Sequence, residues 1–120
     1  MKSATKPYHR LLIWQRAHQF VKDIYAATAQ FPKSEQIGLV SQLRRAAVSV
    51  AANIVEGQAK ATRPDFRRFL SIANSSLAEC EYYLELALEL SFMSGTVYEK
   101  LEESRGEISF LLNKFMRSLR

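Results

Sequence analysis

Apolar residues recur at intervals of three and four along four long stretches of this chain, and no stretch alternates apolar and polar residues as a half-buried strand would. Helix-breaking residues separate the stretches at Phe31-Pro32, at Gly57 and Pro64, and at Gly95. Only 4 Gly and 3 Pro occur in 120 residues, which is little turn material for a β fold. The sequence therefore predicts a single all-α domain of four helices.

The first two helices end at identifiable residues. The first is expected from about residue 10 to residue 30, because Phe31 precedes a proline and so avoids the α region. The second begins at Ser34 or Gly38 and runs to Glu56, with Gly57 placed to be its C-terminal cap. Residues 1–9 are predicted to be an N-terminal tail, and residues 10–120 to be the helical domain.

The last two helices carry N-terminal capping signals. Thr62 fits an N-cap for a third helix that continues to about Phe92. Gly95 is expected to make the next turn, with a fourth helix from Thr96, paired with Glu99 in a capping box, to about residue 119. Short connections place successive helices side by side in opposite directions, so the prediction is an antiparallel up-down-up-down four-helix bundle.

The second and third helices are apolar over more of their circumference than one core requires. Val48 and Val55 flank the main apolar stripe of the second helix, and Ile72, Leu86 and Leu90 widen that of the third. A second interface would bury this surplus, and another copy of the chain is the simplest partner. Close helix packing within one subunit is the alternative.

Polar residues share the opposite flank of the second helix: Gln42, Ser49, Asn53 and Glu56. A hydrolytic site there would need an activated nucleophile and a base, and no histidine is nearby in the sequence. We therefore predict a buried, hydrogen-bonded ridge that fixes helix register.

Charge is distributed unevenly along the chain, whose net charge is +5. Residues 1–68 hold 12 basic and 4 acidic side chains, whereas residues 69–120 hold 5 basic and 8 acidic ones. Lys60, Arg63, Arg67 and Arg68 crowd the start of the third helix, where the helix macrodipole favours anions. Two explanations stay open: a docked anion such as a nucleic-acid phosphate, or pairing with Glu81, Glu85 and Glu89 of a neighbouring helix or subunit.

Enzyme, cofactor and membrane signals are weak. The single cysteine, Cys80, and the dispersed His9 and His18 do not form a zinc site or the paired Glu-x-x-His motifs of a di-iron bundle. The isolated glycines form no phosphate-binding loop. The least polar stretch, residues 46–55, is too short to span a bilayer. We expect a cytoplasmic protein without enzymatic activity, metal or cofactor.

The run from Gln42 to Gly57 contains R-R-A-x-x-S followed by N-I-x-E-G. It resembles the signature of four-helix bundle proteins encoded by intervening sequences of 23S ribosomal RNA genes, a family similar to the accessory variability determinant proteins of diversity-generating retroelements. Trp14-Gln15, Phe31-Pro32 and Phe66 fall in the expected order around it. Ala52 is a departure, because many members carry Ser or Pro there.

The resemblance implies a pentameric barrel of four-helix subunits with a basic outer surface. In the retroelement branch it further implies nucleic-acid binding and a reverse transcriptase partner. We therefore expect a homo-oligomeric scaffold, most simply a homopentamer, that binds nucleic acid, and RNA in particular. The alternative is an adaptor oligomer that docks an acidic protein. The expected nucleic-acid contacts are Arg44, Arg45, Lys60, Arg63, Arg67 and Arg68.

Overall fold

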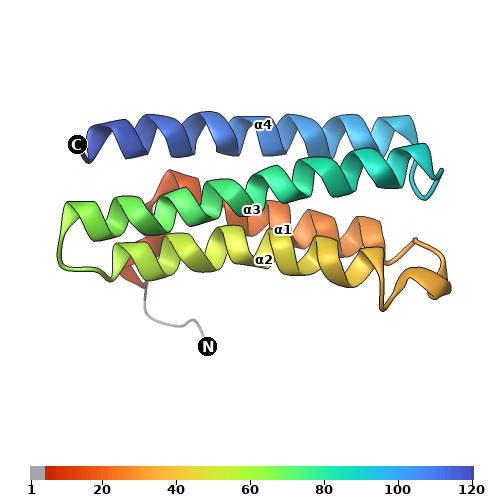
Figure 1. Cartoon of the computed structure of the whole chain (residues 1–120), viewed down its shortest axis with the longest axis horizontal. Helices are drawn as coiled ribbons and strands as arrows, with labels where there is room; N and C mark the ends of the chain where they lie inside the picture. Colours follow the sequence, from red (N-terminus) through yellow and green to blue (C-terminus); the bar gives the residue numbers. More distant parts are fainter. Residues whose placement is uncertain (1–4) are drawn as a thin grey trace.

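The computed structural model describes residues 5–120, and within them it contains helices and no strand. Four long helices lie side by side as a four-helix bundle (Figure 1). Their bounds are α1 Leu12–Thr28, α2 Leu39–Gln58, α3 Arg63–Glu89 and α4 Gly95–Ser118. Two short 3-10 helices, η1 Pro7–Arg10 and η2 Lys33–Glu35, precede α1 and α2. The all-α prediction and the number of long helices are confirmed.

The N-terminal caps agree with the prediction at α3 and differ from it at α4. Thr62 Oγ1 accepts a hydrogen bond from the Asp65 N–H at 3.3 Å, as an N-cap does. At α4, the cap is Ser94, whose Oγ accepts from the Val97 N–H at 3.2 Å. Gly95 is therefore the first residue of the helix rather than a turn. The prediction of Thr96 as the start was wrong because Ser94 offers the same chemistry two residues earlier.

Gly57 does not end α2, which continues to Gln58, and its φ is not positive. A Cβ at this position would lie 2.9 Å from Phe66 Cδ1 and 3.0 Å from Phe69 Cβ. At Gly57 the end of α2 therefore packs against Phe66 and Phe69 of α3 with no room for a Cβ. Among residues 5–120 a left-handed backbone occurs instead at Ser91, with φ 62°, just after α3.

Ordered structure begins before residue 10. Tyr8 and His9 of η1 pack on Trp14, with ring centroids 5.1 and 4.9 Å from the indole. The Lys6 N–H donates to His9 Nδ1 at 3.0 Å, and the His9 side chain is half-buried. Of the predicted tail, residues 1–4 lie outside the described residues, and Pro7–Arg10 belong to the folded domain.

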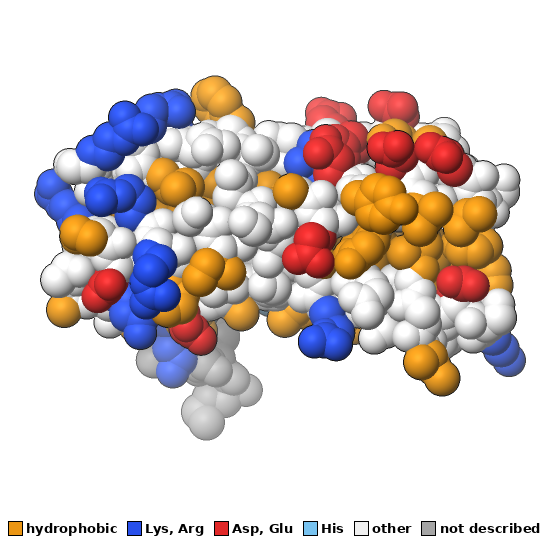
Figure 2. Space-filling model, in the orientation of Figure 1, with side chains coloured by type: hydrophobic (Ala, Val, Ile, Leu, Met, Phe, Trp, Pro, Cys, Tyr) orange, Lys and Arg blue, Asp and Glu red, His pale blue; other side chains and the backbone are white. Residues whose placement is uncertain are grey.

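The core joins all four helices, through side chains such as Phe20, Leu43, Leu77 and Leu112, each at most 1% exposed. The chain does not cover all of its apolar surface. Large apolar side chains of α2, of α3 and of the α3 C-cap remain exposed: Val48, Ile72, Tyr82 and Leu90. Figure 2 shows orange side chains gathered over the second half of α3. Within residues 5–120, no helix is both long and apolar enough to cross a membrane.

Candidate nucleic-acid interface

Three helix ends meet at one end of the bundle, on the left in Figure 1: the end of α2, the start of α3 and the end of α4. Lys and Arg side chains gather toward this end, while most Asp and Glu side chains lie over the opposite half of α3 and α4 (Figure 2). The bundle is therefore electrically polarised along its length. The basic end, as we call it, consists of Lys60, Arg63, Arg67, Arg68, Lys114, Arg117 and Arg120.

Arg67 joins α3 to the end of α4. Its Nη1 donates a hydrogen bond to the Leu119 carbonyl at 2.7 Å, and the side chain is half-buried. The last carbonyls of a helix lack hydrogen-bond donors within the helix and carry partial negative charge. A guanidinium both donates a hydrogen bond to such a carbonyl and supplies the opposite charge. Arg67 is therefore bound within the chain.

Phe69 orients two other predicted cations. Lys60 Nζ lies 4.9 Å and the Arg68 guanidinium carbon 4.6 Å from its ring centroid. Contacts of this kind at exposed sites stabilise by about 0.5–1 kcal/mol and leave the charges in water. Arg68 Nε also lies 4.0 Å from Asp65 Oδ1, an exposed and weak ion pair. Lys60 and Arg68 thus remain accessible to an anion.

The end of α4 adds three cations that were not among the predicted contacts: Lys114, Arg117 and Arg120. Arg117 and Arg120 line a groove of about 440 Å³ together with Arg67 and Arg68. The averaged charge of residues 69–120, which is negative, concealed them. Lys114, Arg117 and Arg120 recur every three residues in the sequence, and this spacing indicates a basic helix end.

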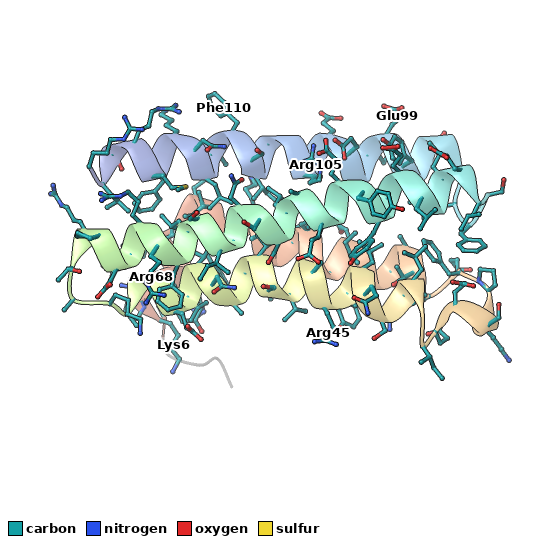
Figure 3. All side chains as sticks on the ribbon, in the orientation of Figure 1. Lys6, Arg45, Arg68, Glu99, Arg105 and Phe110 are labelled. Carbon is teal, nitrogen blue, oxygen red and sulfur yellow. The ribbon has the colours of Figure 1, made fainter. Side chains whose placement is uncertain are left out.

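The structure separates the α2 arginines from the basic end. Arg44 Nε donates to Thr28 Oγ1 at 2.8 Å, and its guanidinium stacks on Tyr25 with its carbon 4.4 Å from the ring centroid. Arg44 is thus committed to holding α2 against α1. Arg45 is exposed in the first half of α2, far from Arg68 (Figure 3). At 1.5 Å per residue, it lies about 20 Å along the axis from the end of α2. The six predicted contacts therefore do not form one patch.

Of the predicted polar ridge, the two middle residues are partly buried and hydrogen-bonded, whereas the two end residues are exposed. Ser49 Oγ lies 2.8 Å from Ser76 Oγ of α3, and Asn53 Nδ2 donates to the Ser49 carbonyl at 2.8 Å. Of these two bonds, only the Ser49–Ser76 contact joins two helices, because the Asn53 bond lies within α2; both Ser49 and Asn53 are partly buried. Gln42 and Glu56 are exposed in the chain, so the burial predicted for them is not found there.

The acidic half has its own partner within the chain. Arg105 of α4 has only 11% of its side chain exposed, and its Nη2 lies 2.9 Å from Glu81 Oε2. The hydrogen bonds that Arg105 donates to Glu102, together with the nearby charges of Glu102 and Glu81, raise the pKa of Arg105 despite its partial burial. Glu81 therefore pairs with Arg105 here, not with the arginines of α3, whereas Glu85 and Glu89 face solvent.

The groups considered for chemistry are packed or dispersed. Within residues 5–120, no three His, Cys, Asp or Glu side chains are placed to hold a metal ion. His18 stacks on Trp14, with ring centroids 4.7 Å apart and planes inclined by 11°. Burial, with a smaller effect of Glu79, raises the pKa of the Cys80 thiol to about 12. A thiol that stays protonated is a poor nucleophile.

These features define an all-helical bundle with a basic end. The 23S rRNA-intervening sequence protein family matches residues 9–114, and the chain belongs to that family. A crystal structure of a Bacteroides thetaiotaomicron protein of unknown function from the S23 ribosomal protein family has the same fold. Its TM-score is 0.81 at 24% identity, over 88% of this chain and 96% of that one. No curated protein matches this chain.

Proposed function

We propose that the chain is a non-enzymatic, homo-oligomeric helical scaffold that binds nucleic acid, with RNA as the expected ligand. The observation that carries this proposal is the basic end. Cations from the α2–α3 connection, from α3 and from α4 converge there, with Asp65 and Glu56 as the nearby carboxylates. Phosphates are the natural counterions for such a surface, because neutralising them releases condensed cations.

The oligomer follows from a different observation. Val48 of α2, Ile72 and Tyr82 of α3, and Leu90 at the α3 C-cap expose apolar side chains, and Figure 2 shows apolar side chains gathered over the second half of α3. Exposed apolar patches mark interaction sites. We infer that the four helices of each chain run in up-down-up-down order. We further infer that several copies pack through these exposed apolar side chains into a closed ring. The number five comes from the resemblance to the intervening-sequence and retroelement proteins. Light scattering should give about five times the chain mass of 13.7 kDa, and a mass of one chain would contradict the ring.

Filter binding with labelled RNAs of unrelated sequence tests the function. Phosphate contacts predict similar affinities for all sequences and a logarithmic affinity that falls by about 0.7–0.9 for each contacted phosphate per tenfold increase in salt. Polyglutamate serves as the competing probe. Binding to polyglutamate without binding to any RNA would support the adaptor alternative, in which the basic end docks an acidic protein.

The retroelement resemblance adds a separate proposal about partners. If this chain serves that branch, a reverse transcriptase should copurify with it when the two are coexpressed. Copurification that persists after nuclease treatment would indicate a direct protein contact. Loss of the enzyme after nuclease treatment would leave RNA as the link between the two proteins.

A further inference from the structure

A groove crosses the basic end between the first turns of α3 and the last turns of α4. Four arginines line it: Arg67, Arg68, Arg117 and Arg120. None of its described lining residues is acidic. Its volume of about 440 Å³ falls in the range of ligand sites, about 300–1,000 Å³, and exceeds what one phosphate group needs.

The two walls of this groove are fixed to each other. Arg67 donates to the Leu119 carbonyl at 2.7 Å, and the rings of Phe66 and Phe115 pack with centroids 5.3 Å apart. Both contacts join α3 to α4 beside the groove. Arg67 therefore positions the walls, while Arg68, Arg117 and Arg120 are exposed and available to a ligand.

An exposed aromatic side chain lies next to the groove. Phe110 of α4 is 63% exposed, and Figure 3 shows it projecting outward from the helix. At 100° per residue, Phe110, Lys114 and Arg117 share one face of α4. Seven residues separate Phe110 from Arg117, which is about 10 Å along the axis. Arg117 thus connects the groove with the aromatic face.

A cationic groove beside an exposed aromatic ring is the combination by which proteins bind single-stranded nucleic acid, since phosphates follow the cations and an unstacked base covers the ring. We propose that the groove and Phe110 together form a binding site for single-stranded RNA. Arg68, Arg117 and Arg120 contact its phosphates, and Phe110 stacks on one base. This inference rests on the proposed function and adds a preference for unpaired RNA.

Phe110→Leu tests the stacking contact, because leucine keeps apolar bulk and helix propensity but has no π face. Base stacking contributes about 5- to 150-fold in affinity per base, so binding to single-stranded RNA should weaken by at least about 5-fold. Duplex RNA, whose bases are already stacked, should bind the variant and the unmodified chain equally. Phe110→Trp should restore single-strand binding and show quenching of its fluorescence by RNA.

The double variant Arg117→Gln, Arg120→Gln tests the groove. It should weaken binding to single-stranded and duplex RNA alike and flatten the salt dependence, because two phosphate contacts are lost. The matched control is Lys22→Gln, Lys33→Gln, which removes the same charge from exposed positions away from the groove and should change affinity little. Inorganic phosphate at millimolar concentration serves as a second probe, and as a competitor it should displace RNA far less effectively than unlabelled RNA does.

The outcomes distinguish the site from the function. Failure of the unmodified chain to bind any RNA would overturn the proposed function and this site with it. RNA binding that is unchanged in the Phe110 and arginine variants would keep the function and refute the site. A lower mass of Phe110→Leu in light scattering would show that Phe110 is an interface between copies, which also overturns the proposal.

Discussion

Substituting Gly57 by alanine provides a sharp test of how α2 and α3 pack. In a helix, alanine is normally favoured over glycine by about 0.5–1 kcal/mol. Here the new methyl group would lie 2.9 Å from Phe66 Cδ1 and 3.0 Å from Phe69 Cβ, so the Phe66 ring, the Phe69 side chain or the helices must move. Overpacking of this kind costs about 1–3 kcal/mol. We therefore expect a net loss of about 1 kcal/mol and a melting temperature lower by about 3–6 °C.

Gly106→Ala is the matched control, because Gly106 lies inside α4 and a Cβ there has no atom within 4 Å. This variant should gain about 0.5–1 kcal/mol from helix propensity alone. Both variants share that gain, so the difference between them isolates the packing cost at Gly57. Urea denaturation at one fixed protein concentration measures both, since self-association adds to apparent stability. Equal stabilisation by the two substitutions would refute the close approach at Gly57.

Three further predictions concern single side chains. Thr28→Val should cost about 1–3 kcal/mol in urea denaturation, because it removes the buried acceptor of Arg44 Nε, and an unchanged midpoint would contradict that bond. Native Cys80 should resist alkylation at pH 8 and react once unfolded, and stability should fall as the pH rises above 9.0 toward 12, since the thiol then ionises only in the unfolded chain. Ser94→Ala should cost about 1 kcal/mol while Thr96→Ala costs nothing measurable, and the reverse order would restore Thr96 as the cap.

The sequence was sufficient for the number of long helices and the cap at Thr62, because these depend on residues within one turn of each other. The prediction for Gly57 was wrong, because a glycine at the end of a helical pattern can either cap the helix or allow close contact with a neighbouring helix. The contact partners, Phe66 and Phe69, identify the second role only once α2 and α3 are placed together.

The candidate site was predictable at α3 and not at α4. Lys60, Arg63 and Arg68 stand close together in the sequence and remain accessible at the basic end. The bond of Arg67 to Leu119 joins residues 52 positions apart, so no local pattern could reveal it. Arg44 gave the same difficulty, because its partner Thr28 lies on another helix.

The separation of charge along the bundle affects how the molecule would approach any polyanion. The bundle is 43 Å long, whereas an electric field in physiological salt decays over about 8 Å. When the basic end touches a phosphate backbone, the carboxylates of the far half therefore lie beyond the reach of its field. Attraction acts at one end without repulsion at the other, so the molecule is turned to meet the polyanion end-on. Low ionic strength extends the field to about 30 Å and brings the acidic half partly within it.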